Sequence, residues 1–304
     1  MTALRSTLQF LLSLWMAGAT VTLAAQEAWL STPESIQAFR EQVESLNPQT
    51  SSFQLASITD RSIQLDGRSI KIRIYDPGGT APQPVLIYVH GACWVAGSLD
   101  SHDEVSRFLA HEGQAVVVAI DYRLAPEHPY PAAHDDVFET IGWVRAHADE
   151  LGVDRNRVAL AGESAGAHLA AATAVRVMDE AAAEPLAFLL LVYAALDGSG
   201  SSWTECKSHY FASPEEARSR YGSPLWVDDL AGMPPTFNIY GEYESPRAEQ
   251  ELFVRKLRED GVAVRAYMNE GVGHDVQTWL SVTGERRAHK VAAGYVREGF
   301  GSAP

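Results

Sequence analysis

The stretch Gly162-Glu163-Ser164-Ala165-Gly166 follows the apolar run 158–161 and precedes a helix-prone segment of small residues, 167–177. This order of strand, glycine-flanked serine and helix is that of a nucleophile elbow, a turn that exposes a serine hydroxyl above the N-terminus of a helix. The flanking glycines suit such a turn because it is too tight for side chains. The pentapeptide is short, and an ordinary strand-to-helix turn also fits it, so the surrounding sequence has to decide between the two.

The apolar runs on either side of this turn predict a sheet. Runs 85–89, 115–120, 158–161 and 188–192 are almost continuously apolar, as in parallel strands that are covered on both faces. Residues 70–75 alternate between apolar and polar and therefore predict a half-exposed antiparallel strand. Helical patterns separate the runs, so we expect an α/β protein with a doubly wound, mostly parallel sheet whose site lies at the carboxyl ends of the strands.

Two segments depart from this alternation. Residues 197–233 are rich in glycine, serine and aromatic residues, and they predict a small lid that lines a pocket, with a plain surface loop as the alternative. Residues 31–57 predict a short N-terminal cap element that begins with a helix opened by Ser31 or Thr32. Length and apolar content indicate a single catalytic domain over residues 26–304.

The first 25 residues have the pattern of a secretory signal peptide. They contain one cation, Arg5, no acidic residue, an apolar stretch over 10–23 and two small residues, Ala24 and Ala25, where cleavage is expected. An uncleaved membrane anchor is the alternative. We expect an exported protein, periplasmic or secreted, with no integral membrane span after cleavage of the signal.

The net charge of −15 argues against nucleic acid or an anionic membrane as a partner, and nothing in the sequence indicates an oligomeric state. Export permits disulfides, and the two cysteines, Cys93 and Cys206, can pair or can both be free. The nearest approach to a metal cluster is His128 and His134 with the aspartates that follow, but these residues lie in a proline-rich loop entering a helix. We therefore expect neither a metal nor a cofactor.

Acyl transfer by a serine requires a base, an acid that orients the base, and amide donors for the oxyanion. The candidate base is His274, in a glycine-bearing loop that follows the strand expected over 262–268. The candidate donors are the amides of Gly91 and Ala92, in the turn after the strand 86–89, and that of Ala165 next to the serine. His90 ends a strand before the nucleophile, so we expect it to hold this turn by hydrogen bonding rather than to act as the base.

The residues alone do not decide which carboxylate orients the base. The strand 236–240 is followed by Glu242 and Glu244, and Asp197 ends the preceding strand. Trp94 and Trp203 are candidates for the walls of the substrate pocket, with core packing as the alternative for both.

Several motifs carry a resemblance to a known family. They are YVHG at 88–91, GSLDSHD at 97–103, DYRLAPEHPYPAA at 121–133, the elbow, SPL at 223–225 and PP at 234–235. With these motifs the chain resembles the hormone-sensitive lipase family of carboxylesterases over about residues 60–300. The resemblance implies the α/β-hydrolase fold and a serine carboxylesterase that acts on small-molecule esters through an acyl-enzyme.

The resemblance also bears on the site. In the family the acid lies a few residues past a strand-ending glycine and just before a proline-containing turn, which points to Glu244, although family members usually carry aspartate there. The family turn is usually His-Gly-Gly-Gly, whereas here Ala92 and Cys93 replace two glycines. The lid is shorter than is usual in the family, which implies a more open site that accepts bulky or branched esters.

Two other functions stay open. The same machinery can cleave an amide or formamide, or an ester on a polymer or toxin. The fold can also serve a catalytically silent binding protein, because a fold does not guarantee an activity.

Overall fold

The structure is a computed structural model that describes residues 29–46, 51–180, 184–282 and 287–301. The predicted signal peptide, residues 1–25, lies outside these ranges, as do residues 47–50 of the predicted cap element. In the described part of the chain, no helix is long and apolar enough to cross a membrane.

An eight-stranded sheet forms the centre of the protein, in the order β1-β2-β4-β3-β5-β6-β7-β8. Strand β2 is antiparallel to both β1 and β4, and all other neighbours are parallel. This confirms the predicted mostly parallel sheet with an antiparallel start. The strands are β1 (Ser57–Leu65), β2 (Arg68–Asp76), β3 (Gln83–Val89), β4 (Val116–Asp121), β5 (Val153–Glu163), β6 (Leu189–Val192), β7 (Thr236–Gly241) and β8 (Val264–Asn269).

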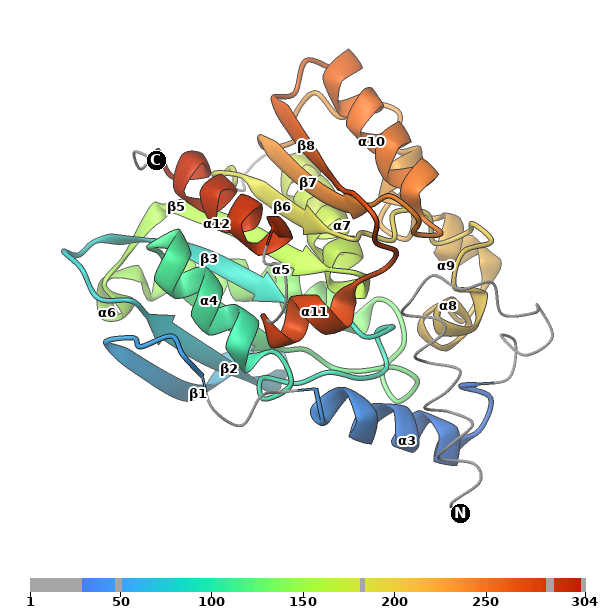
Figure 1. Ribbon diagram of the computed structural model, residues 1–304, viewed down its shortest axis with the longest axis horizontal. Helices are drawn as coiled ribbons and strands as arrows, with labels where there is room; N and C mark the ends of the chain where they lie inside the picture. Colours follow the sequence, from blue (N-terminus) through green and yellow to red (C-terminus); the bar gives the residue numbers. More distant parts are fainter. Residues whose placement is uncertain (1–28, 47–50, 181–183, 283–286, 302–304) are drawn as a thin grey trace.

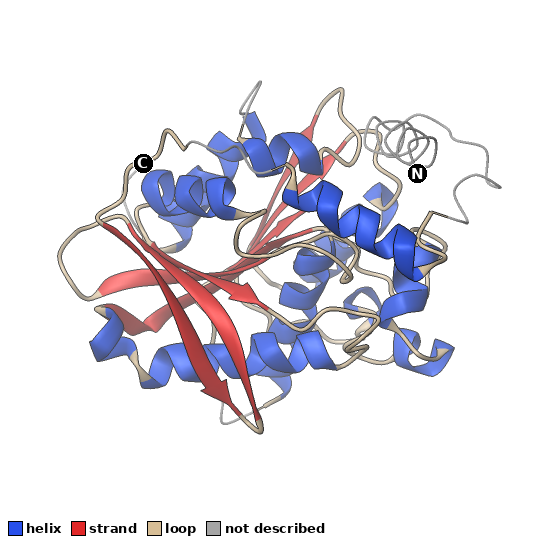
Figure 2. Ribbon diagram, turned by 90° about the horizontal axis from the view of Figure 1, so that it is seen from below, coloured by secondary structure: helices blue, strands red, loops and turns tan. Residues whose placement is uncertain are grey.

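Helices cover both faces of the sheet (Figures 1 and 2). They are α3 (Pro33–Glu44), α4 (Asp103–Gly113), α5 (Ala132–Ala146), α6 (Ala148–Leu151), α7 (Ala165–Asp179), α8 (Thr204–Tyr210), α9 (Pro214–Arg218), η1 (Pro224–Trp226), α10 (Arg247–Glu259), α11 (Val276–Ser281) and α12 (Arg287–Gly299). Helices α5 and α7 pack together on one face, and α4 and α12 pack together on the other.

The central strand β3 shows why its sequence is almost continuously apolar. Val85, Ile87 and Val89 enter the core beneath α5 and α7, and the alternate residues Leu86 and Tyr88 enter the core beneath α4 and α12. Successive side chains of a strand point to opposite faces, so a strand covered on both sides needs apolar residues at every position.

The segment predicted as a lid, residues 197–233, connects β6 to β7 and contains α8, α9 and η1. Figure 1 shows α8 and α9 beyond the end of the sheet toward which β3 points. The start of the predicted cap element is α3, whose first turn is closed by reciprocal hydrogen bonds between Thr32 and Ser35. Helix α3 and the segment 197–233 lie on the side of the sheet where the parallel strands end and their following loops begin (Figure 1).

Candidate active site

Ser164 occupies a sharp turn between β5 and α7. Its backbone has φ 55° and ψ −119°, a conformation that a residue with a side chain rarely adopts. A Cβ at Gly162 would lie 2.4 Å from the Gly166 carbonyl oxygen, and a Cβ at Gly166 would lie 2.1 Å from that of Val89. The turn accepts only glycine at these two places, which is the geometry of a nucleophile elbow and not that of an ordinary turn.

His274 and Glu244 complete a chain of hydrogen bonds to this serine. His274 Nε2 lies 3.0 Å from Ser164 Oγ, and His274 Nδ1 lies 3.1 Å from Glu244 Oε2. The three side chains come from the loops after β5, β7 and β8, and all three are buried. Parallel strands end at one edge of the sheet, and for this reason residues 110 positions apart meet there.

The contacts of the three candidate acids separate them. Glu244 contacts His274, and its other oxygen, Oε1, accepts hydrogen bonds from the Gly241 amide at 3.1 Å and from the side-chain amide of Gln250. Glu242 instead accepts from the Gly271 amide at 2.9 Å.

Asp197, the third candidate, is engaged elsewhere. It accepts from the Ser199 amide at 2.9 Å and from the Ser223 hydroxyl at 3.2 Å. The structure thus brings Glu244, of the three, to the imidazole. Sequence reasoning did not find Gln250, because nothing in the residues distinguishes it from any other polar residue on the amphipathic helix α10.

One of the three amides predicted to bind the oxyanion has another partner in the structure. The Gly91 amide donates to Glu163 Oε1 at 2.5 Å, so this amide holds the turn, which corrects its predicted role as an oxyanion donor. Within the described ranges, the amides of Ala92, Cys93 and Ala165 donate to no other protein group. These three N–H groups are therefore available to a ligand.

Glu163 is a further residue of the site region that the sequence did not single out. Its carboxylate is fully buried next to Ser164, and besides the Gly91 amide it accepts from the Tyr88 hydroxyl. His102 Nε2 lies 2.7 Å from the same carboxylate. The glutamate is visible within the pentapeptide, but only the fold shows that it joins the elbow to the neighbouring turn.

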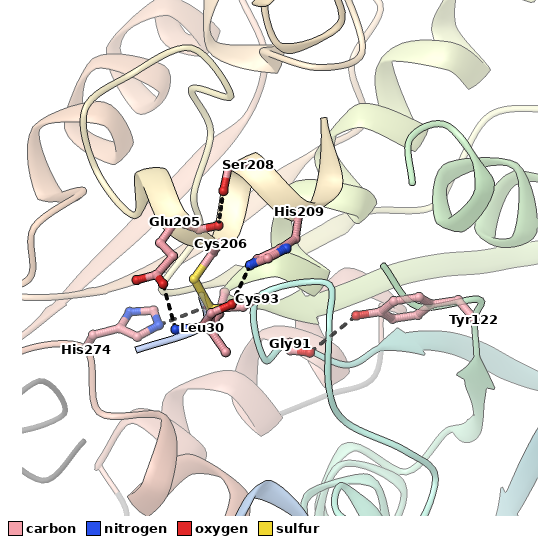
Figure 3. Close-up of a disulfide and its surroundings, with 10 residues drawn as sticks. Leu30, Gly91, Cys93, Tyr122, Glu205, Cys206, Ser208, His209 and His274 are labelled. Atoms are coloured by element: carbon pink, nitrogen blue, oxygen red, sulfur yellow. Dashed lines mark hydrogen bonds between the residues drawn. A yellow bond between two sulfur atoms is a disulfide. The ribbon is translucent and has the colours of Figure 1, made fainter. Parts of the chain in front are cut away.

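His90 holds the turn, as expected. Its Nδ1 lies 3.1 Å from the Gly91 carbonyl oxygen, and its ring stacks on Tyr122 at 4.1 Å between centroids. The Tyr122 hydroxyl donates to the carbonyl oxygens of His90 and Gly91, and the bond to Gly91 is drawn in Figure 3. Burial lowers the pKa of His90 well below its usual value, so this imidazole is neutral near pH 7.

Cys93 and Cys206 form a disulfide, which settles the open question of their pairing (Figure 3). The bond joins the turn after β3 to helix α8 of the predicted lid. In the described part of the chain, there is no group of three or more His, Cys, Asp or Glu residues placed to hold a metal ion.

The two tryptophans differ in their surroundings. Trp94 is 1% exposed and stacks on Tyr210 with ring centroids 5.0 Å apart and planes 3° apart, so it packs behind the turn and presents no open wall. The half-buried Trp203 lies against the imidazole of His274, with ring centroids 4.2 Å apart. Of the two predicted pocket walls, only Trp203 is at the site.

The comparisons with known proteins agree with this geometry. The family described as alpha/beta hydrolase fold matches residues 86–278. The chain is 30% identical over 230 residues to an arylesterase of Saccharolobus solfataricus, a match that covers 71% of this chain and 75% of the relative. It is 36% identical over 228 residues to carboxylesterase NlhH of Mycobacterium tuberculosis (strain CDC 1551 / Oshkosh), which covers 68% and 71% of the two chains.

Solved structures are similar over a longer range. A thermophilic and thermostable carboxylesterase cloned from a metagenomic library has a TM-score of 0.82 at 30% identity, over 93% of this chain and 100% of that chain. An esterase of Pyrobaculum calidifontis has a TM-score of 0.80 at 31% identity, over 92% and 99%. The chain belongs to the alpha/beta hydrolase fold family and, within it, to the esterases similar to hormone-sensitive lipase. It is a carboxylic ester hydrolase.

Proposed function

We propose that the protein is a serine carboxylesterase in which Ser164 is the nucleophile, His274 the general base and acid, and Glu244 the acid that orients the base. The observation that carries this proposal is the buried chain of hydrogen bonds from Ser164 Oγ through the imidazole to the Glu244 carboxylate, at 3.0 and 3.1 Å. Nucleophile, base and orienting acid in hydrogen-bond reach of one another are the arrangement that activates a serine hydroxyl.

The reaction has two steps, acylation of Ser164 and deacylation by water. Ser164 Oγ adds to the ester carbonyl carbon while His274 Nε2 takes the hydroxyl proton, and the tetrahedral intermediate then expels the alcohol, which takes that proton from the imidazolium. Water next adds to the acyl-enzyme with the same imidazole as base, and the carboxylic acid leaves as Ser164 regains its proton. The Glu244 carboxylate accepts a hydrogen bond from His274 Nδ1–H, which keeps the proton of the neutral imidazole on Nδ1, and it stabilises the imidazolium.

The amides of Ala92, Cys93 and Ala165 bind the oxyanion in this proposal. They have no competing protein acceptor among the described residues, and they belong to the two turns that flank Ser164 Oγ. Preorganised amide donors of this kind stabilise the charge that develops on the carbonyl oxygen in the transition state.

The substrates are small esters, and the short lid favours an open site that accepts branched acyl groups. Trp203 supports this proposal, because its half-buried ring lies beside the imidazole and offers the substrate an apolar surface. We expect the protein to hydrolyse p-nitrophenyl butyrate, and to hydrolyse the branched isobutyrate within about tenfold of it, because small changes of acyl shape alter specificity only modestly.

The matched control is the p-nitroanilide of butyric acid, which presents the same acyl group and a closely related leaving group through an amide. We expect it to be hydrolysed much more slowly than the ester. Equal or faster cleavage of the anilide would make the protein an amidase and contradict this proposal.

We also propose that the protein is exported. The pattern of residues 1–25 supports this, and so does the Cys93–Cys206 disulfide, since such bonds persist mainly in oxidising compartments. When the full chain is produced in a bacterium with two membranes, we expect the periplasmic fraction to hold a protein that begins at Ala25 or Gln26, as measured by intact mass.

The control for export is a chain in which a start methionine precedes Gln26, which is expected to remain in the cytoplasm with free thiols. A full-length chain that stays in the membrane fraction with residues 1–25 attached would instead support the anchor.

A further inference from the structure

The turn that carries two of the proposed oxyanion donors has a disfavoured backbone. Ala92, Cys93 and Trp94 have φ values of 70°, 60° and 60°, three consecutive residues with side chains in the left-handed region. The Cβ of an L-residue meets neighbouring backbone atoms there, and only glycine adopts the region freely. Such a turn persists only where its surroundings hold it in place.

Helix α8 supplies two such supports from one of its faces. Cys206 is bonded to Cys93, and Tyr210, one helical turn further on, stacks on Trp94. Residues four apart lie on the same face of a helix, so this face of α8 engages two adjacent residues of the disfavoured turn. All four side chains are buried, with at most 3% exposed.

Helix α8 is in turn anchored to the N-terminal segment. The Leu30 amide donates to Glu205 Oε1 at 2.6 Å, and His209 Nε2 lies 3.0 Å from the Leu30 carbonyl oxygen. Figure 3 shows these contacts around Leu30 beside the disulfide, with His274 nearby. Glu205 and His209 are also four residues apart, so α8 is held on a second face while the first engages the turn.

The residue before α8 contacts the proposed base. Trp203, which precedes the first residue of α8, packs on His274 with ring centroids 4.2 Å apart. A single short helix thus contacts the proposed oxyanion turn, the imidazole and the N-terminal segment.

We propose that the Cys93–Cys206 disulfide, assisted by the Trp94–Tyr210 stack, is a positioning device that holds the amides of Ala92 and Cys93 in the geometry that binds the oxyanion. The support is required because Ala92 and Cys93 carry a Cβ at positions with positive φ, where glycine would adopt the same conformation without strain. This inference rests on the proposed assignment of the oxyanion donors. It concerns the transition state rather than substrate binding, so losing the disulfide lowers kcat and leaves KM in place.

Two double variants that both lack the disulfide test the inference. Cys93→Ala with Cys206→Ala keeps a Cβ at the position with φ 60°, whereas Cys93→Gly with Cys206→Ala places glycine there. For the alanine pair we expect kcat for p-nitrophenyl butyrate to fall by about 10- to 100-fold, somewhat less than the loss of one whole donor, while KM stays within about threefold. For the glycine pair we expect most of the lost kcat to return.

A trifluoromethyl ketone gives an independent readout, because its adduct with the serine carries an oxyanion. Its inhibition constant is expected to rise in the alanine pair by the same factor as kcat/KM falls, and to recover in the glycine pair. All kcat values are divided by the fraction of sites that react with a fluorophosphonate, so that misfolded protein does not count.

Each outcome has a defined meaning. Unchanged kcat in the alanine pair, a change confined to KM, or equal loss in both pairs would overturn the inference. An alanine pair that fails to fold beside a folded glycine pair would support it, and the reverse would overturn it.

If neither pair folds, Tyr210→Leu decides the question with the disulfide intact. We expect this variant to lose kcat at constant KM relative to Tyr210→Phe, which keeps the ring, and equal kcat in the two would overturn the inference. If the wild-type protein shows no hydrolysis that depends on Ser164, the proposed function itself fails, which is a different result from unchanged disulfide variants.

Discussion

Ser164→Ala is expected to abolish ester hydrolysis, with kcat reduced by about 10⁴-fold or more. Alanine removes the only atom that can form the acyl-enzyme in the proposed mechanism, whereas the backbone of the elbow and the proposed amide donors stay in place. The small remaining rate would come from substrate binding and the oxyanion site alone. The measurement is the hydrolysis of p-nitrophenyl butyrate under saturating substrate.

A fluorophosphonate probe makes this prediction specific to the residue. The wild-type protein should be labelled on Ser164, as located by mass spectrometry of its peptides, and the alanine variant should not be labelled. Ser62→Ala is the matched control, because Ser62 is an exposed residue of the edge strand β1 and should leave both readouts unchanged.

Full activity in Ser164→Ala would exclude the proposed nucleophile. A wild-type protein that is folded but neither labelled nor active would favour the catalytically silent binding protein.

Glu244→Gln is expected to lower kcat by about 10²- to 10⁴-fold, with little change in KM. The surroundings of Glu244 explain why an isosteric change has so large an effect. At Oε1 the carboxylate accepts from two N–H donors, Gly241 and Gln250, so a glutamine would place its carbonyl oxygen there. Its NH₂ group would then face His274 Nδ1 and donate to it.

The consequence is the wrong tautomer of the imidazole. With Nδ1 accepting a hydrogen bond, the neutral ring carries its proton on Nε2 and cannot take the proton of Ser164. Rates measured between pH 6 and pH 9 should therefore stay low throughout, because no change of pH in this range makes the amide an acceptor at that position.

Glu242→Gln is the control for this prediction. Glu242 is two residues away and accepts from the Gly271 amide rather than contacting His274, so we expect its kcat within about threefold of wild type. A large loss in Glu242→Gln beside an active Glu244→Gln would reverse the assignment of the acid.

The mostly parallel sheet with its antiparallel start, and the location of the proposed nucleophile, were predictable from the sequence, whereas the order of the strands came from the structure. The apolar runs 85–89 in β3 and 189–192 in β6 indicate burial on both faces, and the glycines around Ser164 indicate a turn that excludes side chains. Both signals are local, because periodicity and steric exclusion act over a few neighbouring residues.

The residues that contact Ser164 and its neighbouring turn were harder to predict from the sequence. Glu242, Glu244 and Asp197 all follow strands that end at the same edge, and the choice among them depends on angles and distances that no spacing encodes. Gly91 was assigned as a donor by its place in the turn, but the adjacent strand places Glu163 against its amide. The hydrogen bond from the Gly91 amide to Glu163 joins residues 72 positions apart in the chain, so no short pattern of residues predicts it.

The sequence by itself determined the class of this protein: a mostly parallel sheet, a serine in a nucleophile elbow and a histidine after the last strand, each encoded in short patterns of residues. Only the tertiary structure decided that Glu244 meets the imidazole, that Cys93 is bonded to Cys206 and that α8 supports the turn beside Ser164. The physical reason is that these contacts join loops and helices distant in the sequence, and their geometry is set by the packing of the whole sheet and its helices rather than by neighbours along the chain.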